Sequence, residues 1–539
     1  MAPPSERLAR SAALAGSATL ASRILGLARD QVLAALFGAG SEMDAFVVAF
    51  RIPNLARTLL AEGAMSAAFV PTFIRHLAER GRPDAWRLGS NVINALIVVT
   101  GAAVLAGMVF ARPIVTLYAG GYRTVPGKLE MTIMLTRVML PFLTLAAVAA
   151  ALMGMLNSLH HYFLPSLSPA VFNVVTIACA LTLTPFMPAI GLPRVMAIAV
   201  GAVLGGAGQV GVQWIPLRRE GFRYTATLRP RDEGLARVLV LMGPGTLGLA
   251  ATQVNLLVNT LLATSQGTGA ASWLAYAFRL MYLPIGLFGV SIATAVLPAA
   301  SHHAAVGDMA GLRATVSRGI RLMLTLNVPA TFGLLALATP IVRLLFERGQ
   351  FTAADTVATA AAVRLYAIGL VAYSTARIAS PVFYAIGKSR VPVAVSGLTI
   401  AVNLFASLTL IRLIGFRGLA LSTSLSAVAN AGALVWLLGR HLHGLEGRQL
   451  ARAAAKMIVA ASTMALTAVI VDRMSAYIVP GGGFVAQSAR LLASIAAALG
   501  VLAATVKLLR VEEFDEALAG LRAQARKSLR RGSVSASGA

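Results

Sequence analysis

The sequence predicts an all-α polytopic membrane protein of about fourteen transmembrane helices, with two parallel six-helix repeats (a pseudo-two-fold axis along the membrane normal) and two C-terminal helices. Composition, segment length and an internal repetition predict this class. Apolar residues make up 58% of the 539 residues and charged residues 12%. The mean hydropathy of +0.78 lies far outside the range of soluble globular proteins. We therefore exclude a soluble multidomain protein.

The long apolar segments match the thickness of a membrane, which a helix of about 20 residues spans. Clusters of glycine, proline and charged residues separate them. The first begins like a signal peptide, but its apolar pattern continues through Arg23 and Arg29, so we expect a retained helix. Prolines interrupt the second and eighth and predict kinks there. In chain order the predicted spans are 12–37, 44–74, 90–118, 131–157, 165–187, 194–216, 237–264, 271–300, 318–345, 356–385, 391–411, 418–439, 450–471 and 484–508.

The net charge of +26 comes from basic residues in the connections between apolar segments, and this distribution predicts the membrane topology rather than nucleic-acid binding. With the N-terminus inside, the inner connections and both termini carry about 28 Lys and Arg, and the outer connections carry about eight. This asymmetry follows the positive-inside rule. We expect both termini in the cytoplasm and no nucleic-acid partner.

Several segments recur at an offset of about 227 residues, which indicates a duplication. ARPIVTLYAGGY from Ala111 matches ATPIVRLLFERGQF from Ala338, and AFRIP at 49–53 recurs as AFRLM at 277–281. Equivalent spans are six apart, so the repeats run in the same direction. The expected parts are an N-lobe at 1–220, a C-lobe at 221–445, two added helices at 446–509 and a cytoplasmic amphipathic tail at 510–539.

Arginines occur inside the apolar segments, where each costs about 2.5 to 3.5 kcal/mol at the centre of a membrane helix. The set comprises Arg23, Arg29, Arg57 and Arg279. Such residues predict a cationic cavity between the lobes, and guanidinium groups bind phosphate oxygens in bidentate fashion. The nearby acids Asp30, Asp44 and Glu62 would form gates. Alternatively, the arginines only pair with these acids or reach a headgroup.

Nothing in the sequence supports catalysis or a cofactor. It contains no Walker loop, no HExxH motif and no large extramembrane domain. Cys179 is the single cysteine and lies in an apolar run, so neither a disulfide nor a thiolate metal site is expected. We expect a protein that is not an enzyme and that holds no metal.

The opening SRILGLARDQVLAALFGAGSEMDAFVVAFRIPNLARTLLAEGAMSAAFVPTF closely resembles the MurJ (MviN) family of lipid II flippases in the MOP exporter superfamily. The resemblance continues through SWLAYAFRLMYLPIGLFGVSIATAVLPAAS and LLFERGQFTAADT. It implies transport of lipid II, the undecaprenyl diphosphate-linked peptidoglycan precursor, from the inner to the outer leaflet of the bacterial cytoplasmic membrane by alternating access. Membrane lipids are implied partners, and the peptidoglycan synthesis machinery is a candidate.

The resemblance also assigns roles to residues. It implies substrate binding by Arg23, Arg29, Arg57, Arg279, Asn54 and Ser272, and gating or polar roles for Asp30, Asp44 and Glu62. The polyprenyl tail would lie in a groove beside the last two helices. Some family members are thought to bind sodium through acids of the second lobe, and this sequence lacks acids in the corresponding helices.

Two other functions remain open at this stage. One is another MOP-type transporter, either a flippase for a different polyprenyl-linked oligosaccharide or a drug or ion antiporter, although cationic drugs fit poorly with surplus arginine. The other is a polytopic glycosyltransferase, which would need a catalytic acid on an outer loop, and the outer loops are short.

Overall fold

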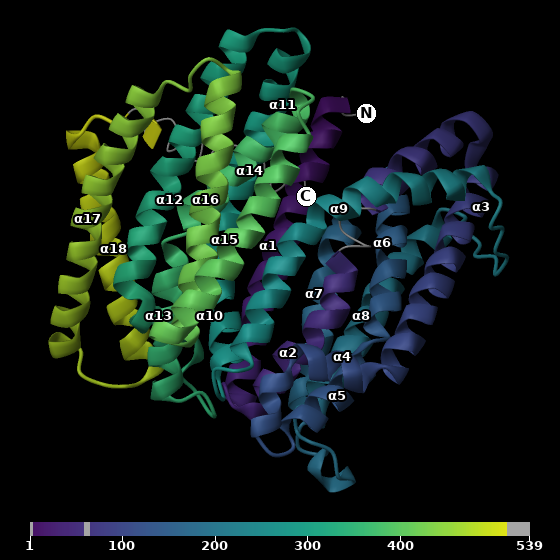
Figure 1. Cartoon of the computed structure of the whole chain (residues 1–539), viewed down its shortest axis with the longest axis horizontal. Coiled ribbons are helices and arrows are strands. Elements are labelled where there is room, and N and C mark those ends of the chain that lie inside the picture. The colour runs from purple at the N-terminus through teal and green to yellow at the C-terminus, as the bar shows by residue number, and fades with distance from the viewer. Residues whose placement is uncertain (1–3, 59–64, 512, 515–539) are drawn as a thin grey trace, which may run out of the picture. The chain divides into compact units, whose positions relative to one another are not determined.

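The computed structural model describes residues 4–58, 65–511 and 513–514, and in these ranges helices dominate and no strand occurs (Figure 1). The chain forms two compact units. One comprises Met1–Trp273 with Phe346–Asp355, and the other comprises Leu274–Leu345 with Thr356–Ala539. Most of the predicted tail at 510–539 lies outside the described residues.

The first unit contains the helices of the first repeat and the helix that follows it. They are α1 (Pro4–Phe37), α2 (Ser41–Arg57), α3 (Met65–Val109), α4 (Ala111–Tyr118), η2 (Gly120–Thr124), α5 (Lys128–Met139), α6 (Phe142–Ser158), α7 (Phe163–Leu183), η3 (Pro188–Ile190), α8 (Met196–Arg219) and α9 (Glu233–Ala263).

The chain leaves the first unit within α10 (Ala270–Pro284). The later elements are η4 (Ile285–Gly289), α11 (Val290–Ala305), α12 (Met309–Phe346), α13 (Ala353–Ala367), α14 (Leu370–Ala385), α15 (Arg390–Ile414), α16 (Phe416–His441), α17 (Gly447–Ile478) and α18 (Phe484–Leu508). The yellow-green α17 and α18 lie side by side in Figure 1.

The described residues include ten helices long and apolar enough to cross a membrane, or eleven if the bent pair α13 and α14 is one span. The protein is therefore an all-α multi-pass membrane protein. In the described residues each of the fourteen predicted segments overlaps a helix, but α1, α2 and α9 are not among the ten. Arginines lower the hydropathy of α1, and α2 has only 17 residues. The count of fourteen is consistent with the structure and stays a prediction.

Helix breaks recur at the offset of the sequence repeat. The helix is interrupted at Phe110 (φ −89°, ψ 15°), and 227 residues later at Leu337 (φ −105°, ψ 15°). A second break separates α5 from α6 next to Pro141, and its counterpart separates α13 from α14 at 368–369. Because Pro141 has no N–H to donate, it weakens the helix there. The repeats thus share backbone detail as well as sequence.

Small residues let the helices of the first unit approach closely. A Cβ atom on Gly205 of α8 would lie 2.8 Å from the Phe172 side chain of α7, and one on Gly206 would lie 2.8 Å from Phe142 of α6. Glycine at both positions removes that obstacle, as is common between membrane helices.

The connection before α12 gives a pH-dependent prediction. A hydrogen bond from the Gly311 main-chain N–H to Asp308 (2.8 Å), assisted by His303 at 2.9 Å, lowers the pKa of Asp308 despite a smaller opposing effect of burial. The native pKa lies below the unfolded one, so the charge stabilises the fold above about pH 4 and this stabilisation is lost as pH falls. We expect Asp308→Asn to lower the thermal midpoint slightly at pH 7, and the difference from wild type to shrink toward pH 3. A difference that stays constant between these values would contradict the assignment.

Candidate functional site

Two of the predicted cavity arginines lie on α1 and differ in their surroundings. The guanidinium of Arg29 donates to one oxygen of Asp30 from both Nε (3.1 Å) and Nη2 (2.8 Å), and lies over the Phe172 ring at 5.8 Å from its centre. Arg23 is partly buried, and among the described residues none forms a hydrogen bond or an ion pair with its side chain. Arg29 is thus charge-compensated in this conformation, whereas Arg23 has no carboxylate partner there.

The predicted residues of α2 lie near its C-terminal end. Asn54 and Arg57 are both partly buried, and their spacing of three places them on one helix face. The Nε of Arg51, one turn earlier, donates to the Thr260 hydroxyl of α9 (3.2 Å). Glu62 lies outside the described residues, so its proposed gating role stays a prediction.

Arg279 lies on α10 within the second unit and is exposed. It occupies the middle of the segment that repeats α2. The shared cavity of all four arginines stays a prediction.

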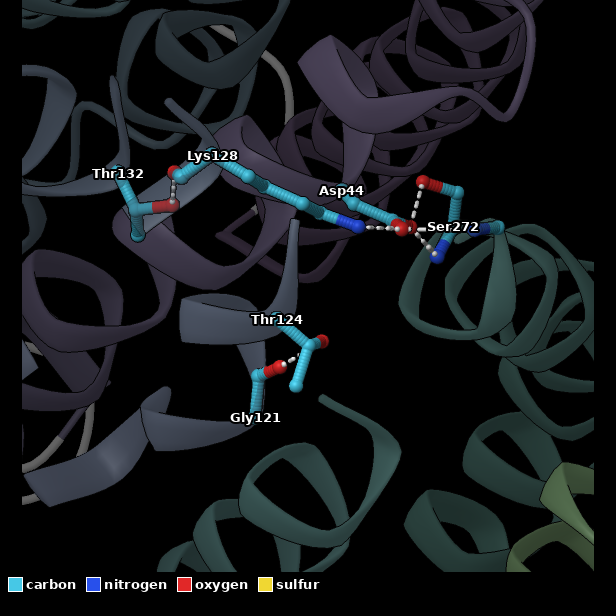
Figure 2. Close-up of polar contacts among 7 residues, drawn as sticks. Asp44, Gly121, Thr124, Lys128, Thr132 and Ser272 are labelled. Carbon is cyan, nitrogen blue, oxygen red and sulfur yellow. Dashed lines mark hydrogen bonds and ion pairs between the residues drawn. The ribbon is translucent and has the colours of Figure 1, made fainter. Parts of the chain in front are cut away.

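The most extensive polar cluster among the predicted residues surrounds Asp44, whose side chain is fully buried (Figure 2). Its Oδ2 accepts from the Lys128 ammonium (2.7 Å) and from the Gly269 N–H (2.7 Å). Its Oδ1 accepts from the Ser272 N–H (3.0 Å) and the Ser272 hydroxyl (2.7 Å). We call Asp44, Lys128, Gly269 and Ser272 the Asp44 cluster. All four belong to the first unit.

The cluster lies where three helices begin. Asp44 is in the first turn of α2, Lys128 is the first residue of α5, and Gly269 and Ser272 belong to the start of α10. The N–H groups of a first helical turn have no partner in their own helix, and the helix dipole favours a negative charge there. Asp44 therefore caps α10 from a distant part of the chain.

Glycines allow this approach. Gly269 has φ of +98°, where side chains are strained, and a Cβ would lie 2.4 Å from the Trp273 ring. The turn before it rests on η2, because a Cβ on Gly121 would lie 2.5 Å from the Thr264 carbonyl oxygen. Figure 2 shows Gly121 accepting from Thr124 (2.9 Å) near the cluster.

The sequence predicted a gating role for Asp44 and substrate binding for Ser272 separately, and gave no such prediction for Lys128. The structure joins Asp44 with Ser272 and adds Lys128, whose side chain is 1% exposed and lies 4.1 Å from the centre of the Tyr122 ring. A signal existed in the repeat, since Lys128 and Asp355 are 227 positions apart and each stands at the start of equivalent helices.

Asp355 takes part in a second contact at the start of α10. Its Oδ1 accepts from Trp273 Nε1 (2.8 Å), and its Oδ2 caps α13 by accepting from the Thr352 N–H (2.9 Å) and hydroxyl (2.8 Å). The segment before it is fixed by a hydrogen bond from the Gln350 N–H to the Ala35 carbonyl oxygen (2.9 Å) at the end of α1. The start of α5 is therefore bonded to the start of α2, and the start of α13 is bonded to the start of α10.

A hollow of about 410 Å³ lies elsewhere, in the connection between α8 and α9. It is lined by Arg229, Pro230, Arg231 and Asp232, and by none of the predicted site residues. Its open, charged wall differs from the enclosed cavity that the sequence predicts.

Comparison with known proteins decides the family. The family model described as "Lipid II flippase MurJ" matches residues 33–484. The chain belongs to the MurJ family. A "Probable lipid II flippase MurJ" of Rhizobium meliloti is 33% identical over 501 residues, which cover 92% of each chain. A "Lipid II flippase MurJ" of Burkholderia cenocepacia is 33% identical over 431 residues, 79% of this chain and 82% of the relative.

Solved structures of the MurJ family and of a neighbouring family have the same fold. A structure described as "Lipid II flippase MurJ, inward closed conformation" superposes with a TM-score of 0.74 at 23% identity, over 92% of this chain and 100% of that one. An inward-facing multidrug resistance MATE family transporter of the MOP superfamily gives a TM-score of 0.65 at 16% identity, over 81% and 99%. The predicted fold class and family are confirmed.

Proposed function

We propose that this protein moves lipid II across the cytoplasmic membrane as a flippase and catalyses no chemical reaction. The observation that carries the proposal is the MurJ family match over residues 33–484, with relatives named as lipid II flippases along most of the chain. The likeness to multidrug transporters concerns the fold alone, and a surplus of arginine disfavours a cationic cargo.

In this proposal the arginines bind the diphosphate of the substrate. Arg23, with no carboxylate partner among the described residues, supports this role, because a guanidinium that is not neutralised is ready to bind an anion. Arg29 would exchange its bond to Asp30 for the diphosphate. Arg57, Arg279, Asn54 and Ser272 complete the proposed substrate-binding set, with Asp30, Asp44 and Glu62 as gating residues.

We propose further that the lobes at 1–220 and 221–445 alternate access to the two leaflets, as expected for parallel repeats. Helices 446–509 would guide the polyprenyl tail. Exposed apolar side chains along α17 and α18 support this role, since they would face hydrocarbon; examples are Ile458, Leu466, Leu492 and Leu499. Both termini would lie in the cytoplasm, and membrane lipids and the peptidoglycan synthesis machinery would be its partners.

The direct test is the leaflet distribution of lipid II in cells depleted of the protein. We expect the precursor to accumulate in the inner leaflet and to become inaccessible to an enzyme that degrades it from outside. Re-expression of the wild-type protein should make lipid II accessible to that enzyme again. Unchanged accessibility after full depletion, with no other flippase present, would refute the function.

A further inference from the structure

We propose that Lys128 is the counter-ion that holds the outer end of the protein closed, by stabilising the Asp44 carboxylate while that carboxylate caps α10. Lys128 acts through Asp44 and is thus a positioning residue. The inference rests on the proposed alternating access, but its test needs no substrate.

Burial and the helix start disfavour the Lys128 ammonium, whereas Asp44 and the face of the Tyr122 ring stabilise it. It is the first residue of α5, where the helix dipole repels a cation, and its side chain is 1% exposed. Among the described residues, Asp44 is the one carboxylate bonded to it (2.7 Å). The pair is neutral as a whole, and either member alone would be an uncompensated buried charge.

The other bonds of Asp44 tie this pair to the point where the chain passes between the two units. Ser272 precedes that crossing, which falls between Trp273 and Leu274. The remaining crossings lie at 345–346 and 355–356, and Trp273 is bonded to Asp355 at the last of them. Any motion of one unit that pulls on α10 therefore acts directly on the Asp44 cluster.

Opening would affect the members of the cluster differently. Gly269 and Ser272 are in the first unit, but they stand at the start of α10, which continues from Leu274 in the second unit, so their donors would leave if that helix moved. Asp44 and Lys128 are on two helices of the first unit and would stay together in water. With Lys128 removed, the closed state keeps a buried carboxylate without a cation, but the open state hydrates it. The substitution therefore penalises the closed state selectively.

The repeat provides independent support. The residue equivalent to Lys128 is Asp355, and the helix equivalent to α2 is α10. Asp355 accepts a hydrogen bond from Trp273 at the start of α10, just as Lys128 contacts Asp44 at the start of α2. In that contact the donor is the neutral indole of Trp273, and the Asp355 carboxylate also accepts from Thr352. Breaking it therefore separates no pair of buried opposite charges. Of the two repeat-equivalent contacts, the one between Asp44 and Lys128 is the ion pair.

The experiment measures how often the cluster opens. Ala271, 5% exposed at the start of α10, is changed to cysteine in a Cys179→Ala background, and right-side-out vesicles are treated with a membrane-impermeant maleimide. We expect Lys128→Met to raise the labelling rate at least about tenfold, and Asp44→Asn to do the same, because each leaves a buried charge unpaired. The double variant Asp44→Asn/Lys128→Met should return most of the way to the parent rate.

Controls separate closure from folding. Lys128→Arg keeps the charge and should be labelled more slowly than Lys128→Met, and Lys388→Met at an exposed lysine should have no effect. A parent-like labelling rate in a folded Lys128→Met variant would overturn the inference. A double variant that is labelled as fast as Lys128→Met would also overturn it. So would a double variant whose thermal midpoint is as low as that of Lys128→Met, because the pair would then have only a structural role. Loss of lipid II transport is scored separately, so a failure of the proposed function leaves this result interpretable.

Discussion

Arg23→Ala is expected to reduce lipid II transport roughly 10- to 100-fold, because each lost charge-assisted hydrogen bond to a phosphate contributes about 1.5 to 3 kcal/mol. Its abundance and thermal stability should stay close to wild type, since Arg23 has no hydrogen bond or ion pair among the described residues. The measurement is the leaflet accessibility of lipid II in cells that express only the variant.

Matched variants make this result specific. Arg29→Ala should lose transport and also stability, because it leaves the buried Asp30 without the guanidinium that contacts it. Arg57→Ala and Arg279→Ala should lose transport as well, and Arg412→Ala, an exposed arginine near the end of α15, should not. Arg23→Lys separates geometry from charge, since an ammonium cannot form the bidentate fork. Full activity of both Arg23→Ala and Arg57→Ala would rule out the proposed diphosphate site.

Gly349→Ala is expected to destabilise the protein by about 2 to 4 kcal/mol, the combined cost of positive φ and of overpacking against backbone. Gly349 has φ of +55°, and a Cβ would lie 2.2 Å from the Ala35 carbonyl oxygen. Gly38→Ala should have a comparable effect, because its φ is +62° and its Cβ would lie 2.4 Å from the Gln350 carbonyl oxygen. The thermal midpoint in detergent is the readout.

Gly397→Ala on α15 is the control for the glycine variants. An added Cβ there meets no atom within 4 Å, so the gain in helix propensity of about 1 kcal/mol should leave the midpoint unchanged or slightly higher. If Gly349→Ala were as stable as Gly397→Ala, the close contact between the end of α1 and the segment before α13 would not exist in solution.

Much of the fold was predictable because apolar length and repetition are written directly in the sequence. The shared offset of Ala111 and Ala338 predicted a duplication, and the helix breaks at Phe110 and Leu337 recur at that same offset. The predicted spans ran through both breaks, although a proline follows each by three residues, at Pro113 and Pro340, and has no N–H to offer the preceding turn.

The candidate site was predictable as residues but less so as contacts. Asp44 and Ser272 were both named, yet their bond joins positions 228 apart, and no local pattern specifies it. Lys128 was missed because a lysine directly before an apolar run is typical of a membrane interface, where it is usually hydrated. Its burial depends on Tyr122 and Asp44, which only the folded chain brings to it.

The matched interruptions at Phe110 and Leu337 also have a historical consequence. Because the break stands at the same position of both repeats and a proline follows each by three residues, we infer that the bend is older than the duplication. The ancestral polypeptide was then half as long and already contained a broken third helix. Such a chain, inserted in a single orientation, could assemble as a symmetric homodimer long before fusion allowed its halves to diverge.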